Sequence, residues 1–297
     1  MSATFNRGTG VLIINVINSN PNGDPDRESE PRTFDADGRG LISPVSFKRK
    51  LRDLMEQEDS DVRRAALAAI GPTQTKSFGI LESRGRDRKA ISAMPIDDFR
   101  AAFWDGRVFG NTFVEKEDKG KFITTGVVQF GPGVSIAPVN IARLTLTNKS
   151  GVEDKKERGM APLAFRVVCH GLYVMPFFVN PSAAHKSGCD ALDIEVLKFL
   201  VPHAYAHTAS GIRPEVHIVH AWYAEHTNPL GSCPDPLILA ALRPKRKAGF
   251  DPEKPSRDIE DYEVPSALPD DLRGRLASFE DLCAKPWPLA ATAGAEN

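Results

Sequence analysis

Five basic side chains are concentrated in one short stretch of this chain, and phosphate is the ligand that such a stretch would bind. They are Arg39, Lys48, Arg49, Lys50 and Arg52. No acidic residue lies between the first and the last of them. A helix capped by Ser43 would add the free N–H groups and partial positive charge of its first turn, and Ser46 would add a hydroxyl. The alternative is a solvated helix face, because runs of surface charge often have no ligand.

A loop made almost entirely of turn-forming residues precedes the basic stretch. Its sequence is Asn18-Ser-Asn-Pro-Asn-Gly-Asp-Pro-Asp26. Backbone N–H groups around Gly23 could hold phosphate or sugar oxygens. Alternatively, the carboxylates of Asp24 and Asp26 suit Mg²⁺ or Ca²⁺, since they lie two residues apart in a turn. The loop is a poor match to an EF-hand, because it lacks both the leading Asp and the final Glu of that motif.

Two further segments could approach a nucleic acid. The first, Gly126-Val-Val-Gln-Phe-Gly-Pro-Gly-Val-Ser135, would let a backbone come close to a polymer, although it lacks the lysine of a nucleoside-triphosphate loop. A plain strand, turn and strand is the competing interpretation of this segment. The second, Arg84-Gly-Arg-Asp-Arg-Lys89, could follow nucleic-acid phosphates or could be a solvated loop.

Residue patterns that would support catalysis are missing from the sequence. His203 and His207 have the spacing of two metal ligands on a helix, but no acidic neighbour completes the site, so we expect structural or surface histidines. The four cysteines form no CxxC pair, and we expect them to be packing residues. No GxSxG or GxGxxG motif occurs. The sequence therefore predicts neither an enzyme nor a cofactor.

The elements that position the basic stretch follow from hydrophobic patterns. Residues 11–17 are rich in β-branched side chains and predict a strand buried on both faces. A helix is predicted over residues 44–57, because Ser43 and Pro44 form a typical helix start and apolar residues recur at helical spacing. On this helix Lys48 and Arg52 lie beside the apolar stripe, whereas Lys50 lies on the other flank.

The later elements give the predicted fold. Strand patterns recur at residues 107–110, 127–130, 163–168, 171–179 and 216–223. A second helix is predicted from its cap, Asp190, to a stop before Pro202. The order is β-α-β-β-α-β with large insertions, which is ferredoxin-like and is the order of RNA recognition motifs.

Three segments fall outside this predicted core. Residues 60–106 are polar, with one helical piece at residues 62–70, and are interpreted as an insertion. The polar connector at residues 147–159 lies between alternating segments and predicts a protruding hairpin. The proline-rich tail from about residue 243 is expected to wrap the surface, with disorder at residues 290–297.

The composition excludes several classes of protein. With 297 residues, of which 41% are hydrophobic, the chain can bury a substantial core and is not disordered, collagen-like or a coiled coil. Its longest apolar runs fall far short of the ~20 residues of a membrane helix, and its N-terminus has no signal segment, so we expect a cytoplasmic protein. The balance of 38 basic and 39 acidic residues argues against indiscriminate coating of nucleic acid, but allows a local basic groove.

Several of these motifs together resemble a known family. They are the loop at residues 18–26, the stretch Leu41-Ile-Ser-Pro-Val-Ser-Phe-Lys-Arg-Lys-Leu-Arg52 and the Phe-Gly-Asn at residues 109–111. Further matches lie at residues 31–32, 37–40, 125–133, 170–173 and 180–181, and at Leu192 and Glu195. Over about residues 6–225 the chain resembles the backbone subunit of the type I-C CRISPR Cascade, in the RAMP superfamily.

The resemblance implies an α+β fold in a single elaborated domain over residues 1–297. Its parts would be a modified RNA-recognition-motif palm, a finger-like helical insertion at about residues 60–106 and a thumb β-hairpin at about residues 144–164. The C-terminal tail, about residues 243–297, is not diagnostic. Because the strands lack the aromatic RNP1 signature, base stacking on the sheet is not the expected mode of RNA binding.

The resemblance also implies a function. Copies of such a subunit bind the crRNA spacer through its phosphate backbone and form a helical filament, which displays the guide for pairing with target DNA. The implied partners are crRNA, the target DNA strand of the R-loop, other copies of the chain, and the processing or cap, large and small subunits of Cascade, with no membrane. The residues matching the RNA-contact motif are Ser43, Ser46, Lys48, Arg49 and Arg52, with Asn20, Asn22, Gln129, Phe130, Gly131 and Gly133 as additions.

Two other functions remain open from the sequence. A metal-dependent ribonuclease would cut target RNA with Asp24 or Asp26. A purely structural assembly protein would place the basic helix against an acidic protein neighbour. Evenly spaced, Mg²⁺-dependent cuts would indicate the first, and a purified protein without RNA would indicate the second.

Overall fold

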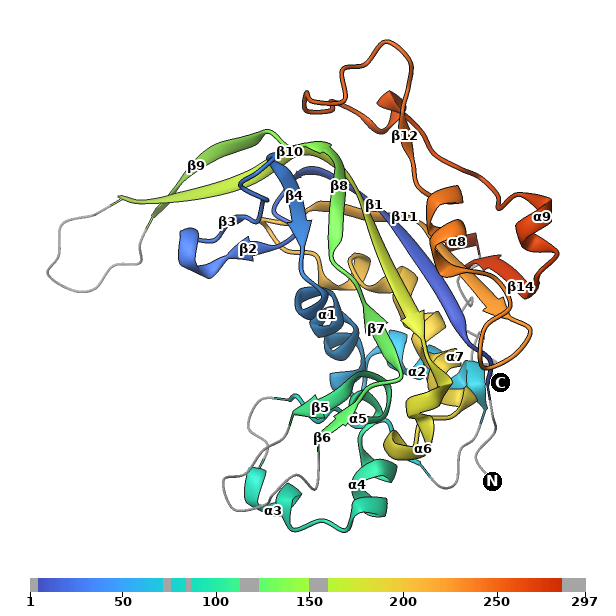
Figure 1. Ribbon diagram of the computed structural model, residues 1–297. Helices are drawn as coiled ribbons and strands as arrows, with labels where there is room; N and C mark the ends of the chain where they lie inside the picture. Colours follow the sequence, from blue (N-terminus) through green and yellow to red (C-terminus); the bar gives the residue numbers. More distant parts are fainter. Residues whose placement is uncertain (1–4, 72–75, 84–86, 113–122, 150–159, 285–297) are drawn as a thin grey trace, which may run out of the picture.

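The computed structural model describes residues 5–71, 76–83, 87–112, 123–149 and 160–284. Within them the protein has a mixed helix-and-sheet fold built on one large antiparallel sheet (Figure 1). Eight strands of the described residues form this sheet, in the order β14-β11-β1-β10-β8-β4, with β7 and β9 also paired to β10. Their bounds are Gly8–Ser19 (β1), Arg39–Ile42 (β4), Val128–Phe130 (β7), Gly133–Pro138 (β8), Ile141–Lys149 (β9), Met160–Val179 (β10), Glu215–His226 (β11) and Leu276–Asp281 (β14).

Strand β1 lies inside the sheet because both of its faces are apolar. Leu12 and Ile14 belong to the core on one face, Val11 and Ile13 to the core on the other, and all four are fully buried. The strand pairs with β10 on one side and with β11 on the other. The strand predicted at residues 11–17 is therefore confirmed, with a few more residues at each end.

Three helices pack on one face of the sheet: α1 (Pro44–Glu56), α2 (Asp61–Ile70) and α7 (Ala191–Leu200). Each begins at a polar cap. Ser43 and Ser60 accept hydrogen bonds from backbone N–H groups, and Asp190 forms a capping box with Asp193. The two helices predicted from Ser43 and Asp190 are confirmed. Helix α2, interpreted from sequence as part of an insertion, instead packs into the main core through Val62 and Ala66.

A smaller lobe follows α2 and holds α3 (Arg88–Ser92), α4 (Ile96–Ala102) and α5 (Trp104–Phe109), with the short pair β5 (Gly110–Thr112) and β6 (Ile123–Thr125). Leu81, Ile91, Phe99 and Phe103 form a separate small core there. The strand predicted at residues 107–110 is wrong, because most of that segment belongs to α5. Trp104 and Val108, four residues apart, are both fully buried in the main core, which favours a helical turn over a strand.

Strand β10 is a single strand of 20 residues, where the sequence predicted two. The predicted break falls at His170, a polar residue within the apolar run. Its ring is buried, with Nε2 3.0 Å from Asn15 Oδ1 and Nδ1 2.7 Å from Ser256 Oγ. Because both ring nitrogens have partners, the strand continues through this position.

The predicted hairpin is present as the pair β9–β10, which runs from Ile141↔Val168 to Lys149↔Met160. Figure 1 shows the two strands projecting together away from the rest of the protein. Most of the polar connector lies outside the described residues, at residues 150–159.

The C-terminal segment covers the second face of the sheet. It contains α8 (Asp235–Ala241), β12 (Lys245–Arg246), β13 (Tyr262–Glu263) and α9 (Asp270–Arg273), and ends with β14, which pairs with β11. Ile238, Leu242, Tyr262 and Leu272 pack here against Val11 and other residues of the sheet. The expected surface-wrapping tail is therefore part of a second core up to residue 284, and the disorder predicted at residues 290–297 lies outside the described residues.

The remaining elements are short. They are β2 (Gly23–Asp24), β3 (Glu30–Pro31), α6 (Ala184–Ser187) and the 3-10 turns Pro25–Arg27, Pro181–Ala183, Val201–His203, Ala206–Thr208, Ile259–Asp261 and Leu282–Ala284. No helix in the part of the chain that the structure describes is long and apolar enough to cross a membrane.

Candidate nucleic-acid interface

The start of helix α1 is fixed by the turn-rich loop before it. Ser43 Oγ accepts a hydrogen bond from the Ser46 N–H group at 3.2 Å, while the Ser43 N–H group donates to Asn22 Oδ1 at 2.7 Å. Asn22 therefore ties the loop to the helix start, and Ser46 is left half-buried in the first turn. Of these candidate residues, Asn22 and Ser43 already use polar groups to build the helix start.

Arg49 is neutralised within the protein. Its guanidinium group lies 2.7 Å from carboxylate oxygens of both Asp53 and Glu56, and it also donates to the backbone oxygen of Glu82. Two carboxylates on one guanidinium leave little net charge for a phosphate. Arg49, which faces away from the apolar stripe of α1, is thus part of a cluster of ion pairs within the protein.

Arg52 is likewise committed to a carboxylate. Its Nε lies 2.8 Å from Asp105 Oδ2, and the side chains of the pair are 11% and 1% exposed. Asp105 also accepts hydrogen bonds from the backbone N–H groups of Leu81 and Glu82. Arg52 therefore fastens α1 to the smaller lobe.

Lys48 differs from these two arginines. Its Nζ lies 5.9 Å from the ring centroid of Phe109, and among the residues that the structure describes no carboxylate forms an ion pair with it. Burial, and then the nearby positive charge of Arg52, hold the pKa of Lys48 below its usual value. Lys48 is a cation at the start of a helix whose charge the described protein groups do not cancel.

Lys50 lies on the opposite flank, and it is buried rather than solvated. Only 6% of the residue is exposed, and its Nζ is 5.1 Å from the ring centroid of Tyr205. Burial and the charge of Arg213 lower the pKa of Lys50 to about 8, opposed by Asp53. Sequence reasoning placed Lys50 correctly on the other flank, but could not detect Arg213, which lies far along the chain and is brought close only by the fold.

The loop residues serve mainly to hold the loop in place. Asn20 is buried, and its Nδ2 donates to the backbone oxygens of Ser29 and Arg166 at 2.7 and 3.3 Å. Asp24 caps the turn at Asp26 and pairs with Arg32 at 3.3 Å. Asp26 is exposed. Within the described residues, no group of three or more His, Cys, Asp or Glu side chains is placed to hold a metal ion.

The glycine-rich segment forms two short strands, β7 and β8, which both pair with β10 and are separated by a bulge, rather than a strand, turn and strand. Phe130 pairs with Phe177 of β10, the Gly131 N–H group donates to the Pro176 oxygen at 2.8 Å, and Val134 pairs with Val174. The pairing thus continues along β10 and is shifted by one residue at the glycine.

Within this segment, packing explains most of the residue types. The ring of Phe130 lies in the core, 5.0 Å from Phe47 and 5.1 Å from Phe177 between centroids, so it is not available to RNA. A Cβ on Gly133 would lie 3.0 Å from Met175 Cε. Gln129 is exposed, and its Nε2 donates to the Gly126 oxygen.

The structure nevertheless brings this segment to the start of α1. Gly133 pairs with Ile42, the residue before the cap Ser43. The candidate surface therefore combines the first turns of α1, the loop residue Asn22 and the glycine-rich segment between β7 and β8. Of the second basic cluster, residues 84–86 lie outside the described residues, and Asp87 caps α3.

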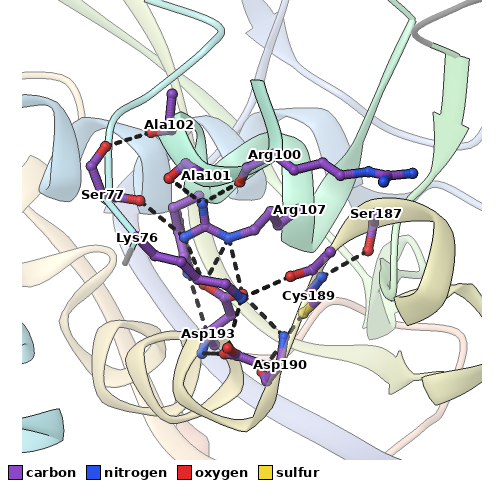
Figure 2. A network of polar contacts seen from close by, with 12 residues as sticks. Lys76, Ser77, Arg100, Ala101, Ala102, Arg107, Ser187, Cys189, Asp190 and Asp193 are labelled. Atoms are coloured by element: carbon purple, nitrogen blue, oxygen red, sulfur yellow. Dashed lines mark hydrogen bonds and ion pairs between the residues drawn. The ribbon is translucent and has the colours of Figure 1, made fainter. Parts of the chain in front are cut away.

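A buried ion network stands apart from this surface (Figure 2). Arg107 is buried and forms a two-pronged pair with Asp193, with nitrogen–oxygen distances of 2.8 to 3.1 Å. Its other N–H groups donate to the backbone oxygens of Ser77, Arg100 and Ala101. Lys76 also pairs with Asp190 at 2.6 Å. The network joins α5 to the start of α7 and contains no uncompensated cation.

Comparisons with known proteins agree on one family. A family model described as CRISPR-associated protein Cas7 matches residues 6–267. A Cas7 protein of Haloferax volcanii is 25% identical over 217 residues, which cover 66% of this chain and 63% of that protein, so the match spans less than two thirds of the relative's length.

Solved structures give a weaker likeness. A chain titled "CRISPR RNA-guided surveillance complex, pre-nicking" has a TM-score of 0.45 and 14% identity, with 80% of this chain and 83% of that chain covered. A second, titled "CRISPR RNA-guided surveillance complex", has a TM-score of 0.38 and 15% identity, with 81% and 77% covered.

Proposed function

The chain belongs to the Cas7 family of CRISPR-associated proteins, and from this premise we propose that it is a backbone subunit of a CRISPR RNA-guided surveillance complex. The subtype that the sequence motifs favour is type I-C Cascade. In this role the chain binds the crRNA spacer and acts as a scaffold rather than as an enzyme, in the cytoplasm. Other copies of the chain, the remaining Cascade subunits and the target DNA strand are its further partners.

The proposed parts of the subunit correspond to regions of the fold. The strand order β11-β1-β10-β8 with α1 and α7 on one face supports an RNA-recognition-motif palm. The lobe around the small core of Leu81, Ile91, Phe99 and Phe103 is the proposed finger. The projecting pair β9–β10 is the proposed thumb.

The observation that carries the proposed RNA binding is the uncompensated charge of Lys48. Lys48 lies in the second turn of a helix whose cap is held by Asn22, and the residue before that cap, Ile42, pairs with Gly133 of the glycine-rich segment. Phosphate is present at every nucleotide, so binding through phosphate accepts any spacer sequence. One copy would contact few phosphates, and copies side by side on one RNA would add their affinities.

Binding to a labelled single-stranded RNA of mixed sequence tests this proposal. We expect Lys48→Met to weaken binding by roughly tenfold, the usual effect of losing a hydrogen bond to a charged group. Lys254→Met removes the same charge from an exposed side chain that pairs weakly with Asp251 and serves as the matched control. Equal affinities of the wild type and Lys48→Met would contradict the proposed site, and a wild type that binds no RNA would contradict the proposed function.

A further inference from the structure

A second pair of cations lies on the flank of α1 opposite Lys48. Its members are Lys50, on the helix, and Arg213, in the segment between the Ala206–Thr208 turn and β11. Lys50 belongs to the basic stretch but not to the residues that match the family's RNA-contact motif, and Arg213 belongs to neither. The pair nevertheless has the electrostatic properties of an anion site.

In the described part of the chain, no group accepts a hydrogen bond from the ammonium of Lys50. Its stem is buried against Tyr205, and within the described residues the Nζ makes no hydrogen bond and no ion pair. The hydroxyl of Tyr205 is itself buried and has no hydrogen-bond partner among the described residues, so it does not accept a hydrogen bond from Lys50. An ammonium carries three donors, and buried cations are normally paired.

Arg213, whose charge acts on Lys50, is held in place by the residue after strand β1. Its Nε donates to the backbone oxygen of Asn20 at 3.0 Å, and the Asn20 N–H group donates back to the oxygen of Ile212 at 2.8 Å. In the described part of the chain the remaining guanidinium N–H groups of Arg213 have no carboxylate partner. The Nε hydrogen bond therefore fixes the position of the Arg213 guanidinium. Its two terminal NH2 groups remain available to donate hydrogen bonds.

The two cations repel each other, and among the described residues the acid that acts on Lys50 is already paired with another cation. The charge of Arg213 is one of the causes that lower the pKa of Lys50. The acid that acts on Lys50 is Asp53, but Asp53 already pairs with Arg49 at 2.7 Å. A protein gains nothing in stability from two neighbouring unpaired cations, since both their repulsion and their desolvation oppose folding.

We propose that Lys50 and Arg213 form a second phosphate-binding site, which takes one phosphodiester group of the bound RNA. This inference rests on the proposed function and extends the RNA path to the other flank of α1. A guanidinium can donate two parallel hydrogen bonds to the oxygens of a phosphate, and a lysine ammonium adds a positive charge beside them. The site lies at the base of the β9–β10 hairpin, because Asn20, which holds Arg213, also donates to the Arg166 oxygen of β10. The RNA would therefore pass between the helix and the hairpin.

Lys50→Met tests the proposal through two readouts that move in opposite directions. Methionine keeps most of the volume and the unbranched shape of lysine, but removes the charge. We expect the RNA affinity to fall roughly tenfold. The melting temperature of the RNA-free protein should rise by about 2 °C, because an uncompensated buried charge is lost. Lys254→Met is the control that changes neither readout.

The outcomes separate the inference from the function on which it rests. Unchanged RNA affinity in Lys50→Met, with weakened binding in Lys48→Met, would overturn the second site and leave the function standing. A lower melting temperature with unchanged affinity would make Lys50 a packing residue. Retention of poly-glutamate by the wild type but not by Lys50→Met, without any change in RNA binding, would assign the site to an acidic protein partner instead. A wild type without RNA affinity would overturn the proposed function itself.

Discussion

Two groups of buried cations in this protein differ in whether the protein neutralises them. Arg107 is surrounded by acceptors: a carboxylate of Asp193 and three backbone oxygens (Figure 2). Lys50 is almost as buried, yet it lies against an aromatic ring, the charge of Arg213 opposes its own, and the acid that acts on it, Asp53, is paired with Arg49. Burial alone therefore does not distinguish a structural cation from a ligand-binding one. The distinguishing property is whether the surrounding protein supplies the opposite charge.

The same distinction divides the basic helix itself. Arg49 and Arg52 are paired with Asp53, Glu56 and Asp105, whereas Lys48 has no ion-pair partner within the described ranges of the chain. A count of positive charges along the sequence treats all of them alike. The structure pairs the two arginines with carboxylates, whereas neither Lys48 nor Lys50 forms an ion pair among the described residues.

The largest effect is expected from breaking the neutralised network. Arg107→Met would leave the carboxylate of Asp193 buried, with Lys76 at 3.5 Å as its remaining ionic partner among the described residues. We expect the free energy of unfolding to fall by about 3–5 kcal/mol, as for other buried pairs that lose one partner. Urea denaturation measures this change.

The control for Arg107→Met is Arg64→Met, which removes an arginine from an exposed pair with Asp61 and should change stability by less than about 0.5 kcal/mol. If the two variants are destabilised equally, the contrast between neutralised and exposed cations is wrong.

A smaller effect, with a distinctive pH dependence, is expected from Lys50. Its folded-state pKa of about 8 lies below the value of 10.5 for a free lysine, so the unfolded chain binds more protons between these two pH values. The RNA-free protein should therefore gain stability as the pH rises from 8 to 10. Relative to Lys50→Met, the gain should amount to at most about 3 kcal/mol.

The other groups around Lys50 do not mask this dependence. Burial raises the pKa of Tyr205, whose ring lies against Lys50, far above this window. Denaturation curves at pH 8, 9 and 10 provide the measurement. Parallel pH profiles for the wild type and Lys50→Met would show that Lys50 is not the group that titrates.

The smallest effects concern the paired arginines of α1. Arg52→Met leaves the nearly inaccessible Asp105 with the backbone N–H groups of Leu81 and Glu82 as its donors among the described residues, and should lower stability by about 2 kcal/mol. Arg49→Met disrupts a pair that is 40% exposed and should cost less than about 1 kcal/mol. In both variants RNA affinity should fall less than in Lys48→Met. If either arginine variant lost more RNA affinity than Lys48→Met, the proposal that Lys48 rather than the paired arginines binds RNA would be wrong.

Local patterns were sufficient to predict the elements around the site. The apolar run of β1, the Ser43 cap and the Asp190 cap each depend on neighbouring residues, and all three predictions are confirmed. The predictions that were wrong depend on distant partners. His170 continues a strand because Asn15 and Ser256 bind its ring, and Arg107 lies in a helix beside Asp193.

The candidate site shows the same limit. The basic stretch could be located from the sequence, and so could the proximity of the loop, since Asn22 holds the helix start. The sequence could not show which cations are neutralised, because Asp105 and Arg213 reach α1 only in the folded chain. Nor could it show that the ring of Phe130 is needed by the core.

The salt dependence of RNA binding tests the central claim most directly, that uncompensated lysines on α1 hold RNA phosphates. For single-stranded RNA, each neutralised phosphate contributes about 0.7 to the slope of log affinity against log salt concentration. The double variant Lys48→Met/Lys50→Met should therefore bind RNA with a slope shallower by about 1.4 than that of the wild type. An unchanged slope in a folded double variant would contradict the account.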